Sequence, residues 1–185
     1  MCNIFIKKIN HFIKDESGNE AVELAVLFPI ILLIVGFILD RFIQYEGVTS
    51  VTSATNEAMR YAIVADGPSE AKDILSTTLG DRFKASGLAW CTGNDSSSCD
   101  YWKNNINVTT NEESFKSNPK SNLLIEIDDK GWCLDSYITV GVRAHKASVF
   151  PSYESFQHLM KEGGPIYHTH TYIITARIET NNVCE

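Results

Sequence analysis

A single carboxylate, Glu23, stands where a polar stretch of the chain meets a long apolar run. Gly18 precedes it by five positions, and the apolar run extends from Leu24 to Leu39. Placing an ionised acid near the end of a membrane helix costs on the order of 1–3 kcal/mol, so the charge needs a reason to be there. Glu23 is therefore the first candidate for a functional group, as a carboxylate that pairs with a cation at the edge of a membrane.

Five cysteines form a second set of reactive residues. Cys2 precedes the apolar run, and the other four follow it. Four cysteines in an exported domain predict two disulfides, with three possible connectivities. The short polar segment between Cys91 and Cys99 favours that pair, which leaves Cys133 with Cys184. Zinc is the competing interpretation, but the chain has no Cys-x-x-Cys pair, and we expect no metal.

Histidines and acids near the C-terminus are weaker candidates for ligand binding. His168 and His170 would lie on the same face of a strand, and with His145 they could ligate a metal, but exposed histidines without a ligand are far commoner. Asp128-Asp129 with Asp135 could bind Ca²⁺, although no loop of regularly spaced oxygen ligands surrounds them. We expect a solvated turn there and no metal at either place.

Four large aromatic residues near the cysteines favour core packing over a sugar-binding surface. No Ser, His and acid grouping stands in a motif, and no glycine-rich phosphate loop is present. The sequence therefore predicts neither an enzyme nor a bound cofactor. The aromatic residues are Trp90, Tyr101, Trp102 and Trp132.

The charge distribution limits the partners and predicts an orientation. The net charge is -7, and the basic residues are scattered, which argues against nucleic-acid binding. Lys7, Lys8 and Lys14 form the one local basic group, and they precede the apolar run. Because basic residues beside a span resist translocation, we expect a cytoplasmic N-terminus and an exported chain after Arg41.

The apolar run should stay in the mature protein as a single membrane helix. No small-residue cleavage site follows it at 39–43, as a secretory signal would require. With the flanking Ala21 and Val22 it approaches the roughly 20 residues of a full crossing. Pro29 and Gly36 lie inside it and are tolerated in membrane helices. The residues that define this helix are Leu24, Phe28, Pro29, Gly36 and Leu39.

The remaining chain predicts an α+β fold. Small residues at helical spacing extend the first helix from 19 to 66, where Gly67 suits a left-handed cap, and a shorter helix follows over 71–83. Alternating patterns then predict three or four antiparallel strands and, at 151–161, a short helix. The predicted strands are 123–127, 138–144, 172–179 and an edge strand at 105–109.

The stretch Gly18-Asn19-Glu20-Ala21-Val22-Glu23 with the apolar residues that follow, and Asn56-Glu57-Ala58-Met59-Arg60-Tyr61-Ala62 further on, resembles the TadE-like pseudopilins. These are minor subunits of the tight-adherence branch of type IV pili. The likeness covers roughly residues 10–66. It implies that a prepilin peptidase cuts between Gly18 and Asn19 on the cytoplasmic side, and that Glu23 becomes the fifth residue of the mature chain.

This resemblance implies a leader at 1–18, a transmembrane and extended helix at 19–66, and an extracytoplasmic α+β domain at 67–185. The implied function is that of a minor pilin, with the prepilin peptidase, other pilin subunits, the assembly platform and the membrane as partners. The implied location is the cytoplasmic membrane, as a single-pass protein that can be incorporated into a surface pilus. The alternative is an anchored binding or accessory protein of a secretion or conjugation machine that never polymerises.

Overall fold

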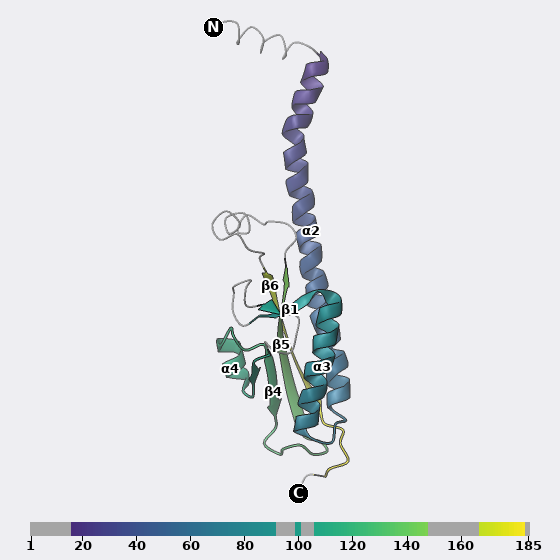
Figure 1. Ribbon diagram of the computed structural model, residues 1–185, viewed down its shortest axis with the longest axis vertical. Helices are drawn as coiled ribbons and strands as arrows, with labels where there is room; N and C mark the ends of the chain where they lie inside the picture. Colours follow the sequence, from purple (N-terminus) through teal and green to yellow (C-terminus); the bar gives the residue numbers. More distant parts are fainter. Residues whose placement is uncertain (1–15, 92–98, 101–105, 148–166, 184–185) are drawn as a thin grey trace.

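The computed structural model describes residues 16–91, 99–100, 106–147 and 167–183. Its dominant element is the 47-residue helix α2 (Glu16–Ala62), whose N-terminal part stands clear of every other described element (Figure 1). The C-terminal part of α2 packs beside a shorter helix and a sheet. The architecture is therefore α+β with a long N-terminal apolar helix, as the sequence predicts at this level.

Helix α2 ends at Ala62, four residues before the predicted end at 66. The carbonyl of Ile63 accepts a hydrogen bond of 2.8 Å from the backbone N–H of Glu179, so the C-terminal segment takes the acceptor that a continuing helix would use. Ala65 closes the turn with a bond of 3.1 Å to the carbonyl of Ala62. A tertiary contact therefore sets this boundary, which is why local sequence signals place it late.

The second helix, α3 (Pro68–Ser86), confirms the predicted amphipathic helix and runs antiparallel to the end of α2. Pro68 occupies its first position, where the missing N–H has no helical partner to lose. The left-handed cap predicted at Gly67 is wrong, because that residue has φ -168° and is extended. The left-handed residue is Gly87, at the other end, with φ 65°.

Strand β5 is the centre of the sheet. Along one edge it pairs over its whole length with β6, and along the other it pairs first with β4 and then with β1. β3 adds to β4 in parallel, and the two-residue β2 extends β1. The strands are β1 (Leu88–Cys91), β2 (Cys99–Asp100), β3 (Val108–Thr109), β4 (Leu123–Ile127), β5 (Tyr137–Ala147) and β6 (Tyr167–Arg177).

This mixed sheet of five strands, with β2 attached, corrects the expectation of three or four antiparallel strands. The predicted strand 123–127 is found unchanged as β4, and 138–144 lies within β5. β1 and β2 are too short to show an alternating pattern, and the parallel pairing of β3 depends on the distant partner that it meets. The helix predicted at 151–161 lies outside the described residues.

A short helix, α4 (Glu112–Ser117), forms in a polar segment rich in Ser, Asn, Glu and Lys. The side chain of Asn111 caps it by accepting a 3.0 Å hydrogen bond from the backbone N–H of Ser114. Phe115 is fully buried, and its ring lies 4.7 Å from the guanidinium of Arg143 on β5. A capping signal and one buried aromatic residue thus position this helix.

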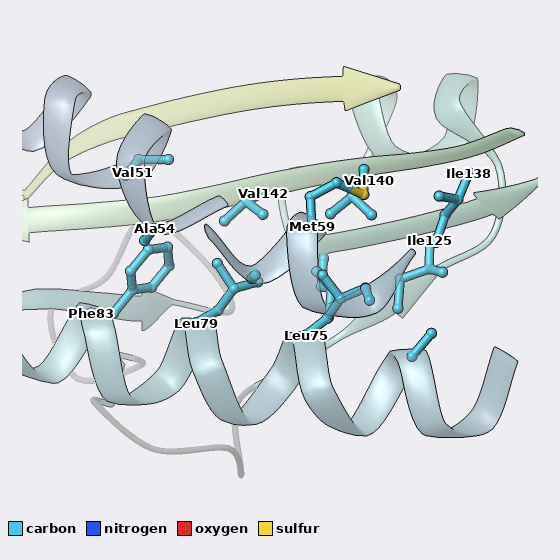
Figure 2. Close-up of a cluster of buried hydrophobic side chains, with 14 of the residues drawn as sticks. Val51, Ala54, Met59, Leu75, Leu79, Phe83, Ile125, Ile138, Val140 and Val142 are labelled. Atoms are coloured by element: carbon cyan, nitrogen blue, oxygen red, sulfur yellow. The ribbon is translucent and has the colours of Figure 1, made fainter. Parts of the chain in front are cut away.

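The hydrophobic core lies between the two helices and the sheet (Figure 2). Helix α3 contributes Leu75, Leu79 and Phe83, each with no exposed surface, and these side chains point toward the residues of β5 and β4. Helix α2 contributes smaller residues from its C-terminal half, so that it approaches the sheet closely. The labelled residues of α2, β4 and β5 in this cluster are Val51, Ala54, Met59, Ile125, Ile138, Val140 and Val142.

Candidate functional site: the apolar helix and its junction with the sheet

The N-terminal half of α2 exposes its apolar side chains on all sides. From Val22 to Leu39, every large apolar side chain is between 44% and 73% exposed. A helix that is apolar all round needs a membrane or protein partner to cover it. Among the described residues, α2 is the one helix long and apolar enough to cross a membrane, by length and composition alone.

The residues predicted to define the membrane helix lie in this half. Leu24, Phe28 and Leu39 are 67%, 58% and 45% exposed. Pro29 lies inside α2 without ending it, although its ring nitrogen cannot donate to the carbonyl one turn earlier. Gly36 is covered by its neighbours in the helix. The helix therefore continues without a break through Pro29 and Gly36.

The predicted processing bond between Gly18 and Asn19 lies in the first turn of α2, because the helix begins at Glu16. The first four backbone N–H groups of a helix have no acceptor within it, so unwinding this turn disturbs few hydrogen bonds. Glu23 lies about two turns from the helix start, with its side chain exposed. The structure places these three residues along one helix end but does not test their roles.

Where the apolar half ends, the sheet covers a carboxylate. Asp40 directly follows Leu39 and is only 4% exposed. Its Oδ1 lies 3.0 Å from Nε2 of His168 on β6, and because a carboxylate only accepts, that nitrogen donates. The side chain of Gln44 donates to the second oxygen, also at 3.0 Å. Two hydrogen bonds thus stabilise an acid at the junction between helix and sheet.

About two turns beyond Asp40, Gly47 lets the sheet approach α2. A Cβ atom at this position would lie 2.3 Å from Nε2 of His170, closer than any real contact allows. Beside it, Nζ of Lys146 forms an ion pair of 2.9 Å with Glu46. The absence of a side chain at Gly47 therefore makes room for His170.

Two buried histidines of the sheet have surroundings that favour the neutral ring: His170 on the face toward α2, and His145 on the opposite face of β5. Burial, with Arg143 and His170 nearby, lowers the pKa of His145 to about 4. Burial also lowers the pKa of His170, with smaller contributions from His168 and Lys146. Nδ1 of His145 and Nε2 of His170 have no hydrogen-bond partner among the described residues. The two rings therefore behave as buried apolar groups around neutral pH.

A metal at these histidines stays without support. No group of three or more metal-ligating side chains occurs in the described part of the chain. His168, the one of the three that lies next to a carboxylate, pairs with Asp40 instead. Among the candidate Ca²⁺ ligands, Asp135 has φ 69° and pairs with Arg177 at 3.0 Å. Asp128 and Asp129 line an open acidic groove at the far end of the sheet.

The described backbone bears on both predicted cysteine pairs. The antiparallel register of β1 and β2 places Cys91 directly opposite Cys99. The backbone N–H next to the buried Cys133, that of Leu134, donates to the carbonyl of Asn182, two residues before Cys184. Cys184 lies outside the described residues, and no disulfide joins two described side chains. Cys133 itself is disulfide-bonded, to a partner outside the described residues. Its pairing with Cys184, and that of Cys91 with Cys99, stay predictions.

The aromatic residues near the cysteines pack in the core where they are described. Trp90 is fully buried, with its ring 4.8 Å from that of Phe83. Trp132 donates its indole N–H to the carbonyl of Ala65 at 2.9 Å, which ties the loop before β5 to the end of α2. Tyr101 and Trp102 lie outside the described residues.

Sequence reasoning missed the roles of Asp40, Gln44 and Gly47. Their spacing of four and three residues places them on one face of α2, continuous with the buried Val51. The sequence did carry one signal for these roles. Asp40 follows the apolar run without a spacer, and Gly47 lies two turns later on the same face of the helix. The partner of Asp40, His168, is 128 residues away, which no local pattern reveals.

No protein-family model, no curated protein and no solved structure matches the chain.

Proposed function

We propose that this protein is a minor pilin or pseudopilin, which a prepilin peptidase processes between Gly18 and Asn19 and which takes part in assembling a tight-adherence type IV pilus or a related secretion filament. The observation that carries the proposal is the division of α2. Its first half, Val22–Leu39, exposes apolar side chains all round, and its second half is built into a small α+β domain. A subunit of a helical filament needs such a free apolar rod on a folded head.

The processing step fits the chemistry of the helix start. Cleavage after Gly18 would leave an ammonium group on Asn19, about one helical turn from Glu23. The positive end of a helix also favours a nearby carboxylate. In an assembly, Glu23 of one subunit pairs with the ammonium group of the next, which compensates a charge removed from water and sets the axial register.

The domain arrangement proposed from this is a leader at 1–18, an anchor and extended helix from 19, and an extracytoplasmic α+β domain. The three lysines before the apolar run support a cytoplasmic N-terminus in the cytoplasmic membrane. The partners are the prepilin peptidase, sister pilin subunits, the assembly platform and lipid. Cys91 with Cys99, and Cys133 with Cys184, form disulfides in the exported domain.

Substituting Gly18→Leu tests the processing site. The bulky side chain should block the peptidase, so that the chain keeps the size of the precursor on a gel. Gly36→Leu, inside the apolar half of α2 and far from the bond, is the matched control and should be processed normally. A mature-size product from Gly18→Leu would contradict the proposed site.

Substituting Glu23→Ala separates processing from assembly. The variant should be cut as the wild type is, but it should enter filaments at least about tenfold less efficiently, because a desolvated charge pair contributes a few kcal/mol. The control is Glu46→Ala, an exposed acid on the same helix outside the apolar half. Wild-type filament yield from Glu23→Ala would show that the charge sets no register.

The alternative function is an anchored binding or accessory protein that is cleaved by no prepilin peptidase and never polymerises. It needs the same helix and the same domain, so the two differ in the mature N-terminus. If the protein purified from membranes of its own host still carries residues 1–18, the alternative function is favoured.

A further inference from the structure

The junction between α2 and the sheet also bears on how the protein meets a membrane surface. Asp40 follows Leu39, the last residue of the apolar run, with no spacer. The carboxylate already accepts hydrogen bonds from Gln44 and from His168, the second residue of β6. The end of the sheet therefore lies level with the end of the apolar run.

The length of the apolar half leaves no free stretch of helix between a bilayer and the sheet. Val22 to Leu39 spans about 26 Å at 1.5 Å per residue. The hydrocarbon core of a bilayer is about 30 Å thick, so it takes up the whole apolar half. Its boundary on the side of the sheet then passes at the level of Asp40.

The faces of α2 that the sheet leaves open at this level carry residues typical of a membrane interface. Phe42 and Tyr45 are 65% and 68% exposed. The exposed guanidinium of Arg41 lies 4.8 Å from the centre of the Phe37 ring. Tyrosine is enriched where hydrocarbon meets headgroups, and interfacial tyrosine and arginine side chains anchor a helix there.

Polar contacts join this open face to the sheet. Arg41 donates to the side-chain oxygen of Gln44 at 3.1 Å, and Gln44 in turn donates to Asp40. Asp40 accepts from His168 on the sheet. The acid at the hydrocarbon boundary thus has donors on both sides, which offsets the free-energy cost of its position.

We propose that the end of the sheet formed by β5 and β6 rests in the phospholipid headgroup layer, with Asp40 at the hydrocarbon boundary and Arg41 bound to lipid phosphate. The proposal rests on the membrane anchoring of α2 in the proposed function, but not on processing or filament assembly. The domain then stands directly on the bilayer, without a stalk.

Depth-dependent quenching tests this placement. The full chain is reconstituted in vesicles of phosphatidylethanolamine and phosphatidylglycerol, with a fluorophore attached through an azide-bearing residue at position 42 or 45, so that the cysteines stay untouched. Leu33, 73% exposed in the apolar half, is the reference for the hydrocarbon. Val64, 55% exposed beyond the end of α2, is the reference for water.

At positions 42 and 45, a nitroxide on the lipid headgroup should quench at least about twofold more than one in the middle of the acyl chain, as for other interfacial residues. The order should reverse at 33, and neither lipid should quench at 64. Quenching at 45 as weak as at 64 would show a domain held away from the bilayer. Stronger quenching at 45 by the acyl-chain nitroxide would show a sheet end immersed in hydrocarbon.

A substitution at Arg41 tests the proposed contact with lipid phosphate. Arg41→Gln should weaken headgroup quenching at position 42, whereas Arg60→Gln, an exposed arginine three residues before the turn, should not. Equal profiles for both variants and the wild type would overturn the role of Arg41. Absent quenching at 33 would instead overturn the membrane anchoring itself, so the two failures are distinguishable.

Discussion

The two halves of α2 belong to one continuous helix but meet different surroundings. In Val22–Leu39 the large apolar side chains are at least 44% exposed, whereas Val51, Ala58 and Ala62 in the second half are at most 1% exposed. The first half is rich in large aliphatic residues on every side. The second half places small apolar residues on the face that meets α3 and the sheet.

This difference shows how the side chains of a single helix can suit two different surroundings. Large aliphatic side chains all round suit a partner that surrounds the helix, as lipid or a bundle of sister helices does. Small side chains on one face suit close packing against a partner of fixed shape, because the backbone can approach it. The change falls at Asp40, where the sheet begins to cover the helix.

The largest expected contrast comes from removing one phenylalanine ring in each region. Phe83→Ala should destabilise the domain by about 3–5 kcal/mol, because the ring is fully buried and packs against Trp90. Phe28→Ala, in the apolar half, should leave domain stability unchanged. Urea unfolding in detergent, followed by tryptophan fluorescence, measures both. Similar losses for the two variants would mean that the apolar half belongs to the folded core.

Acidification should weaken the sheet-packed region next. The pKa of His145 lies at about 4 in the folded protein, below its ordinary value of 6.5, because of burial and the nearby Arg143 and His170. Between these values the unfolded chain binds a proton that the folded chain does not. Stability should therefore be complete above pH 6.5 and fall by about 3 kcal/mol as the pH drops to 4.

The matched control for this pH dependence is His145→Leu, which keeps an apolar side chain of similar volume. Its unfolding free energy, measured by urea titration at a series of pH values, should change much less between pH 6.5 and 4. An unchanged slope in the variant would assign the pH dependence to other groups.

A smaller effect should follow from filling the space at Gly47. Gly47→Ala places a methyl group against His170 and should lower the unfolding free energy by about 1–3 kcal/mol. Gly80→Ala on α3, where nothing lies within 4 Å of the added carbon, should raise it by about 0.5–1 kcal/mol. Thermal melting of both variants checks the signs. A stabilised Gly47→Ala protein would contradict the close approach of α2 and the sheet.

Much of the fold could be predicted where the pattern is local and repeated. The short apolar run Leu123–Ile127 predicts β4 with its bounds, and the helical spacing of Leu75, Leu79 and Phe83 predicts α3. α3 follows from one buried face, whereas β4 is a short apolar run that is buried on both faces over Leu123–Ile125. The sequence predicts the wrong backbone conformation for Gly67, which is the extended N-cap of α3, because glycine permits several backbone conformations.

The features that local patterns could not predict depend on distant partners. The parallel pairing of β3 with β4 depends on how the chain between them folds back. The role of Gly47 depends on His170, which packs against it from the sheet. The candidate site divides in the same way. Glu23 and the apolar run stand out in the sequence, whereas the contact between Asp40 and His168 needs the fold.

The most direct test of the central claim is mass spectrometry of the mature N-terminus of the full-length protein, purified from membranes of its own host. The account predicts that the chain begins at Asn19 and keeps the apolar half of α2. A chain that begins at the initiator methionine, or beyond Leu39, would contradict it.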